Sequence, residues 1–133
     1  MNYYNTFILV SEDCPVEESK APELNGKKKT VAAYEYEMLK EKPAHYTQDE
    51  LQFEVHMRHK EIAESDRDEE LSKFLAKSRA CMRASALPKR YGYGIYFDQE
   101  GKAELVPVES DKYKQMQTRK DLQIVKGMRS KRN

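Results

Sequence analysis

The fold is decided by the stretch Arg83-Ala-Ser-Ala-Leu-Pro-Lys-Arg-Tyr-Gly-Tyr-Gly-Ile-Tyr-Phe-Asp-Gln-Glu-Gly-Lys-Ala-Glu-Leu-Val-Pro-Val108. Its segment Asp98-Gln-Glu-Gly101 has the pattern of a type I turn followed by a glycine in the left-handed region, the usual three-residue hairpin connection. This turn sets the register of the two flanking strands. The pairs that it predicts are Phe97–Ala103, Ile95–Leu105 and Tyr93–Pro107. Their side chains share one apolar face, which other parts of the chain must cover because an isolated hairpin is only marginally stable.

Length and composition predict one domain over residues 1–133 with a real core. The chain has 133 residues, of which 38% are hydrophobic and 35% charged. A net charge of +1 excludes a strong overall attraction to nucleic acid or to membranes. The charge is uneven, because residues 61–70 carry six acids against one arginine and the tail 126–133 carries four bases and no acid. Such asymmetry is typical of solvated faces and less often of binding ends.

The N-terminal segment and the cysteines predict a cytoplasmic protein with no membrane partner. A basic segment followed by an apolar run, which would indicate a signal peptide, is absent. The apolar run Phe7–Val10 is too short to span a bilayer. Cys14 and Cys81 show no paired spacing, which favours free thiols in a reducing compartment.

The first half of the chain predicts a strand, an exposed loop and a helix. The run Asn5–Val10 is short, apolar and rich in β-formers, and residues 15–29 have a loop composition. Thr30 can cap a helix that runs to about Lys42, where Pro43 forces it to stop. The alternation within Tyr34–Met38 also fits a strand, so this alternative stays open.

The clearest period-two pattern of the chain lies in Leu51–Arg58. Its apolar residues fall on one face and its polar residues Gln52, Glu54, His56 and Arg58 on the other. We therefore predict a half-exposed strand whose polar face is partly wet.

The second half predicts two more helices and a last strand. Asp66 with Glu69 has the spacing of a capping box that opens a helix to about Ser78. Residues 79–83 are expected to be extended, and Ser110 is expected to cap a short helix. The helix that opens at Asp66 is predicted to have the apolar stripe Leu71, Phe74 and Leu75. The last strand is predicted at Leu122–Val125. The order of the elements predicts an α+β domain with a mainly antiparallel or mixed sheet of about five strands, a central hairpin and two to three helices.

Several blocks of the sequence resemble a known family. They are Asn5-Thr-Phe-Ile8, Glu12-Asp-Cys-Pro15, Phe53-Glu-Val-His56, the run Cys81–Gly94 and Met128-Arg-Ser-Lys-Arg132. Together they resemble a family of small bacterial proteins that is catalogued only as a domain of unknown function. The resemblance implies a single-domain cytoplasmic bacterial protein, and it brings no activity, ligand or catalytic residue with it.

The entrance to the hairpin holds the best candidate binding site. Arg83, Lys89 and Arg90 flank Tyr91 and Tyr93, and glycines alternate with these tyrosines. Guanidinium and ammonium groups suit phosphate or carboxylate, and glycines let a backbone approach a ligand closely. The spacing matches neither the P-loop nor the dinucleotide fingerprint. The ordinary alternative is a basic turn before a strand whose tyrosines lie in the core.

Three other residues are candidates for chemistry. Glu54 and His56 would lie on one strand face about 7 Å apart, where they could act as an acid/base pair. Cys81 lies two residues from both Arg79 and Arg83, which could favour its thiolate. Because the chain lacks HxH and HExxH spacings, we expect no metal site and no cofactor.

The sequence therefore predicts a non-enzymatic binding module for an anionic small molecule or partner. The first alternative is an enzyme that uses His56, Glu54 or Cys81 on the exposed sheet face. The second is weak nucleic-acid binding through the tail 126–133, for which four bases without an aromatic residue are slight evidence. The oligomeric state stays open.

Overall fold

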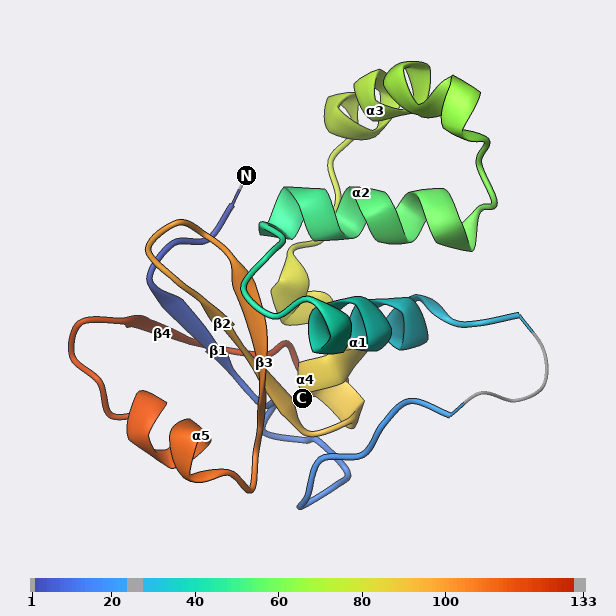
Figure 1. Cartoon of the computed structure of the whole chain (residues 1–133). Coiled ribbons are helices and arrows are strands. Elements are labelled where there is room, and N and C mark those ends of the chain that lie inside the picture. The colour runs from blue at the N-terminus through green and yellow to red at the C-terminus, as the bar shows by residue number, and fades with distance from the viewer. Residues whose placement is uncertain (1, 24–27, 131–133) are drawn as a thin grey trace.

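The computed structural model describes residues 2–23 and 28–130, which form one mixed four-stranded sheet covered by helices (Figure 1). The strand order is β3-β2-β1-β4. Among the described residues there are four strands and five α-helices, so the expectation of about five strands and two to three helices is wrong in its numbers. The predicted α+β class and the mixed sheet are confirmed.

The hairpin forms as its turn predicts. Strand β2 (Tyr93–Phe97) pairs antiparallel with β3 (Ala103–Pro107). All three predicted pairs, from Phe97–Ala103 at the turn to Tyr93–Pro107 at the open end, are found. Gly101 has φ +81°, and the Asp98 carboxylate accepts hydrogen bonds from the backbone N–H groups of Glu100 and Lys102 at 2.9 Å. The left-handed residue and this local hydrogen bonding are what fix the register.

The other two strands come from the ends of the chain. Strand β1 (Thr6–Leu9) pairs antiparallel with β2, and β4 (Gln123–Lys126) pairs parallel with β1. Both strands lie within a residue or so of where their apolar runs predict them. The parallel pair is possible because the long connection from β1 to β4 passes through all the remaining elements.

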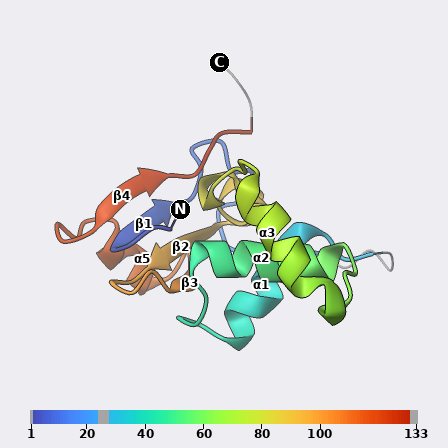
Figure 2. The same cartoon turned by 90° about the horizontal axis from the view of Figure 1, so that it is seen from above.

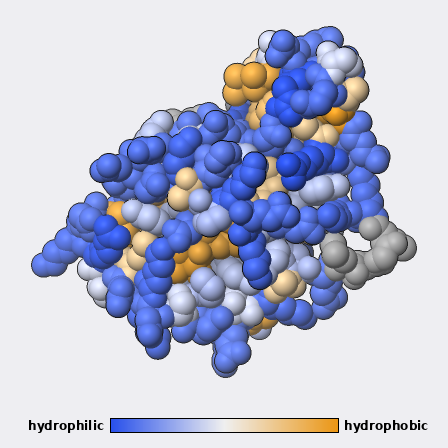
Figure 3. All heavy atoms as spheres, viewed as in Figure 1, coloured by the Kyte–Doolittle hydropathy of each residue, from blue (hydrophilic) through white to orange (hydrophobic). Residues whose placement is uncertain are grey.

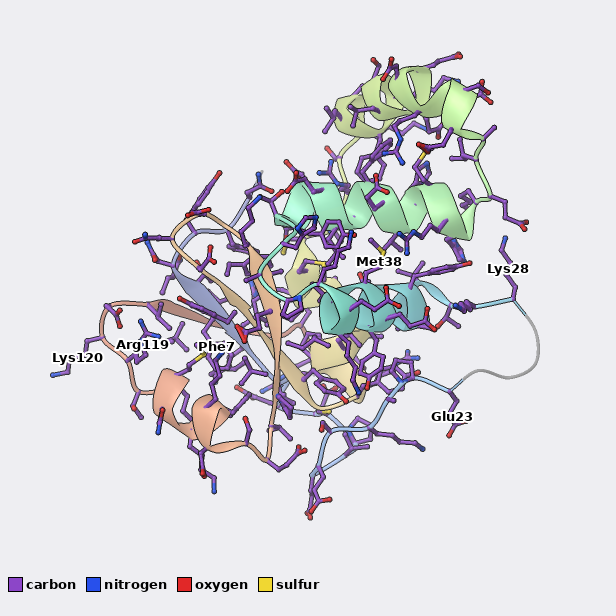
Figure 4. All side chains as sticks on the ribbon, viewed as in Figure 1. Phe7, Glu23, Lys28, Met38, Arg119 and Lys120 are labelled. Atoms are coloured by element: carbon purple, nitrogen blue, oxygen red, sulfur yellow. The ribbon has the colours of Figure 1, made fainter. Side chains whose placement is uncertain are left out.

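Helices cover the hairpin face that the sequence predicts to be apolar. Helix α1 (Val31–Glu41), capped by Thr30, and helix α2 (Gln48–His59) pack on this face with the short helix α4 (Ala86–Arg90). Figure 2 shows α1 and α2 on one side of the sheet. In Figure 4, Met38 lies between α1 and α2. The fully enclosed side chains of this core include Ile8, Met38, Leu39, Leu51, Leu87, Ile95 and Phe97.

The opposite face of the sheet is covered by α5 (Asp111–Met116), which Ser110 caps as predicted. Phe7 is buried between the sheet and α5 (Figure 4). The centroid of its ring lies 5.2 Å from that of the Tyr113 ring. Gly94 makes room for this pair, because a Cβ there would lie 2.8 Å from the Phe7 ring. The mixed face of the hairpin is therefore a second small core.

The predicted strand Leu51–Arg58 is wrong, because these residues belong to helix α2. At about 100° per residue, Leu51 and Val55 share one side of the helix, and Phe53 and Met57 share the other. All four are buried. The first pair enters the main core, and Phe53 packs under Phe74 of helix α3 (Arg67–Ala76) with ring centroids 5.5 Å apart. A helix that is buried on two opposite sides can therefore have the same alternation of apolar and polar residues as a half-exposed strand.

The capping box also forms elsewhere than expected. The Thr47 hydroxyl accepts from the Glu50 N–H at 3.3 Å, and the Glu50 carboxylate accepts from the Thr47 N–H at 2.9 Å. Asp66, the predicted cap of α3, makes no side-chain cap bond within the described residues. A short 3₁₀ turn, Glu64–Asp66, leads into α3 instead.

Helix α3 is the outermost helix in Figure 1, where it lies above α2, and none of its own residues is buried. Two residues of its predicted apolar stripe, Leu71 and Leu75, are 36% and 55% exposed. They contribute to the hydrophobic patch over α3 in Figure 3. In the described part of the chain, every helix is too short or too polar to cross a bilayer.

Candidate functional site

A pocket of about 560 Å³ lies where α1, α2 and α3 meet the segment 79–86, and we call it the helical pocket. Segment 79–86 includes a second 3₁₀ turn, Met82–Ala84, which precedes α4 where extended chain is predicted. The apolar part of the wall is Val31, Ala32, Val55, Phe74, Ala80, Met82, Ala84 and Ala86. The polar part is Glu35, Gln52, His56, His59, Lys60, Arg79, Cys81 and Ser85. Such a pocket, mostly apolar with a few converging polar groups, is the usual form of a small-molecule site.

Glu35 is the buried carboxyl of this pocket, with only 5% of its surface exposed. The Ser85 hydroxyl donates a hydrogen bond to Glu35 Oε1 at 2.7 Å. Burial raises the pKa of Glu35 to about 7, and the Ser85 hydrogen bond opposes this rise only in part. A carboxyl with such a pKa exchanges its proton near neutral pH, as ligand-linked and catalytic carboxyls do.

Two of the three residues that the sequence offers as candidates for catalysis, His56 and Cys81, line the same pocket. His56 Nε2 lies 2.8 Å from the Glu70 carboxylate, which ties α2 to α3, and the hydrogen bond from His56 lowers the pKa of Glu70. The Tyr3 hydroxyl donates to the Cys81 sulfur at 3.1 Å. Burial, with a smaller contribution from Cys81, raises the pKa of Tyr3 to about 12, so Tyr3 is a stable donor to this sulfur.

The mouth of the pocket is basic. His59 and Lys60 lie at the C-terminal end of α2, and Lys60 is exposed. Burial lowers the pKa of His59, and the positive charges of Lys28 and Lys60 lower it further. Figure 4 shows Lys28 on the segment that leads to the N-terminus of α1, near this end of α2. Within the described residues, Lys60 on the pocket wall and Lys28, whose charge acts on His59, form no ion pair with a carboxylate.

Other polar groups of the pocket are committed to the scaffold. Arg79 forms an ion pair with Asp49, donates to Gln52 at 2.9 Å and stacks 4.4 Å from the centroid of the Phe74 ring. Gln52 also donates to the Ala80 carbonyl at 2.9 Å. These contacts hold segment 79–86 against α2 and fix one wall of the pocket.

The residues of the predicted anion site do not share one surface: some contact the core or the backbone, and others are exposed on α4. Arg83 donates to the backbone carbonyl of Lys126 at 2.6 Å, which ties segment 79–86 to β4. Lys89 is half-buried and Arg90 exposed on α4. Tyr91 is half-buried beside the main core, and Tyr93 is only 8% exposed, with its ring 5.5 Å from that of Tyr36. Whether Arg83, Lys89 and Arg90 bind an anion is untested and stays a prediction.

Glu54 and His56 do not form the pair that a strand would create. Glu54 forms an ion pair with Arg67 and lines a separate groove of about 620 Å³ between α2 and α3. Because α2 is a helix, residues two apart point in different directions. Across residues 2–23 and 28–130, the side chains also form no cluster of three or more His, Cys, Asp or Glu suited to a metal.

The basic tail is partly paired where it is described. Lys126 and Arg129 both form ion pairs with Glu12, whose pKa falls to about 2 because the two cations donate hydrogen bonds to it. Arg129 is therefore held to the loop that follows β1. Residues 131–133 of the predicted nucleic-acid site lie outside the described residues.

Sequence reasoning missed Glu35, although the sequence contained a signal for it. Ala32, Glu35 and Leu39 follow one another at helical spacing in the segment predicted as a helix, and all three are buried. A lone glutamate on the apolar stripe of a helix is unusual and could have marked the site.

Comparison with known proteins identifies the family. A search of curated proteins and a search of solved structures gave no match. The model described as "Family of unknown function (DUF6157)" matches residues 1–133. The chain therefore belongs to this family of unknown function, as the sequence blocks suggested.

Proposed function

We propose that this protein binds a small anionic molecule with an apolar body, and that the helical pocket is its site. The observation that carries the proposal is the combination of an apolar wall with the cation Lys60 at the mouth, where Lys28 adds positive charge close to His59. The N-terminus of α1, at Val31 and Ala32, also borders the pocket and adds positive partial charge there. An anionic group would lie at the mouth, and the apolar body would extend inward toward Glu35.

The chemical class of the ligand is the one that the sequence predicts, but the proposed site is different. At the hairpin entrance, Tyr93 is in the core and Arg83 is bonded to a backbone carbonyl, which leaves few groups to meet a ligand. Lys60 offers its charge beside an apolar cavity. Burial of an apolar body then supplies affinity that a surface cluster of cations lacks.

The test compares the two sites with one probe. Calorimetric titration with hexanoate is expected to show binding to the wild type, and Lys60→Ala should weaken it about tenfold, the equivalent of one lost charge-assisted contact. The matched control is Arg90→Ala, which removes a cation from the other site and should leave hexanoate binding unchanged. The opposite pattern would place the site at the hairpin entrance, and no binding at all would contradict the proposal.

A second candidate function is catalysis, favoured by the presence of His56 and Cys81 on the pocket wall with Glu35. Thiol and imidazole groups at one site suit acyl transfer. Release of p-nitrophenolate from p-nitrophenyl acetate, lost in both Cys81→Ser and His56→Gln but kept in the control Cys14→Ser, would favour an enzyme. Equal release by all four proteins would argue against it.

We also propose that the protein works in a reducing, cytoplasmic setting, which for this family we infer to be bacterial. The support is that Cys14 and Cys81 are both free and half-buried. Thiol titration of the unfolded protein without reductant should find two free groups. If the titration finds no free thiol, the proposal of a reducing compartment is wrong.

A further inference from the structure

We propose that the ligand is bipolar: its carboxylate lies at Lys60, and a protonated amine at its inner end pairs with Glu35. This inference rests on the proposed function and names the chemical class of the ligand, a carboxylate and an amine joined by an apolar chain. It begins from the way in which the fold presents Glu35.

The Ser85 hydroxyl engages only one of the two carboxyl oxygens of Glu35, a residue that lines the pocket. The Ser85 oxygen accepts a hydrogen bond from the Leu87 N–H at 3.1 Å, and its single proton goes to Glu35 Oε1. Among the described residues, this is the hydrogen bond that the carboxyl receives, and every fully buried polar side-chain atom has a partner. Glu35 Oε2 therefore keeps some accessible surface, and Glu35 is one of the residues that line the cavity.

The fold itself does not need a charge at this position. Glutamine at residue 35 could accept the same hydrogen bond from Ser85 without the cost of burying a carboxylate. A buried carboxyl with one open oxygen is instead suited to a cation that arrives with the ligand.

No cation of the protein is placed to fill this role among the described residues. The charged or titratable groups that line the pocket around Glu35 are His56, His59, Lys60, Arg79 and Cys81. None of them contributes to the pKa of Glu35, which reflects burial and Ser85 alone. His56 is paired with Glu70 and Arg79 with Asp49, while Lys60 lies exposed at the mouth.

The two ends of the pocket therefore differ in charge, with an acid inside and unpaired cations outside. A ligand with an inward carboxylate would meet Glu35 with like charge, and a ligand with an apolar inner end would leave Oε2 without a partner. An inward ammonium group would donate to Oε2 while Ser85 keeps its bond to Oε1. Once paired, Glu35 would be ionised, whereas in the empty pocket burial favours its neutral form.

The experiment uses two probes that differ only at the inner end. ε-Aminohexanoate should bind the wild type about tenfold more tightly than hexanoate, which corresponds to one buried charge-assisted pair. Glu35→Gln should remove this advantage, so that the two probes bind the variant with equal affinity. Equal affinity of the two probes for the wild type, or an advantage that survives Glu35→Gln, would overturn the inference while hexanoate binding still supports the proposed function. If neither probe binds, both proposals fail.

A second measurement needs no variant. At about pH 6, below the pKa of Glu35, binding of ε-aminohexanoate should release protons, because Glu35 ionises on pairing. Calorimetry in two buffers of different ionisation enthalpy measures this release, and hexanoate is the control that should release none. Proton uptake or no proton exchange with ε-aminohexanoate would contradict the pairing.

Discussion

The Ser85 hydroxyl donates a hydrogen bond of 2.7 Å to Oε1 of Glu35 and so joins the middle of α1 to the N-cap of α4. The same hydroxyl oxygen caps α4 by accepting from the Leu87 N–H. One serine thus starts a helix and orients the buried carboxyl of the helical pocket. The contact links residues 50 positions apart in the sequence.

The first prediction concerns Glu35 and pH. Its pKa rises from 4.5 to about 7 on folding, so the folded state holds a proton that the unfolded state loses. Glu35 therefore lowers the free energy of unfolding in a way that depends on pH: the loss is absent below about pH 4.5, grows as the pH rises to about 7 and is constant above. The shift in pKa corresponds to a maximum loss of about 3 kcal/mol. Glu35→Gln should therefore be more stable than the wild type at about pH 8 and similar to it at about pH 4. Urea unfolding at both pH values measures this, and a difference that does not change with pH would refute it.

The second prediction concerns the turn of the hairpin. Gly101 lies at φ +81°, and a Cβ there would lie 2.9 Å from the Tyr4 ring. Gly101→Val should destabilise the protein by about 2 kcal/mol, because β-branched residues are strongly disfavoured at positive φ. Gly101→Asn is the matched control, since it adds a Cβ but tolerates this conformation, and it should cost clearly less. Equal melting temperatures of the two variants would show that the backbone conformation is not the cause.

The third prediction compares two helix starts. Thr47→Ala removes the capping box of α2 and should cost about 1 kcal/mol of unfolding free energy. Asp66→Ala, at the start of α3, should change it by less than about 0.5 kcal/mol, because Asp66 makes no cap bond within the described residues. Denaturant titration of both variants provides the measurement. A larger loss for Asp66→Ala would mean that α3 is capped after all.

The fourth prediction concerns the stability of α3. This helix buries none of its own residues and is joined to α2 by the Glu54–Arg67 and His56–Glu70 pairs and by Phe74. Its amides should therefore exchange with deuterium faster than those of α1, because opening α3 exposes little apolar surface. Phe74→Ala should speed exchange in α3 further and leave α1 unchanged. Equal protection of the two helices would indicate that α3 unfolds only with the whole domain.

Part of this structure follows from the sequence because its causes are local. The turn Asp98–Gly101 determines the register of β2 and β3, since a glycine in the left-handed region and a capping aspartate act over a few residues. Thr30 and Ser110 cap their helices for the same reason. The apolar runs at both ends of the chain likewise predict β1 and β4.

The sequence by itself thus determined the α+β class, the hairpin register and the helix starts at Thr30 and Ser110, because each depends on neighbouring residues. Only the tertiary structure decided that Leu51–Arg58 is helical, because burial on two opposite sides, by the sheet and by α3, produces the same alternation as a strand. It also brought Glu35 together with His56, Cys81 and Ser85 in one pocket. That arrangement depends on how α1, α2 and segment 79–86 pack, and packing between distant segments leaves no pattern in local sequence.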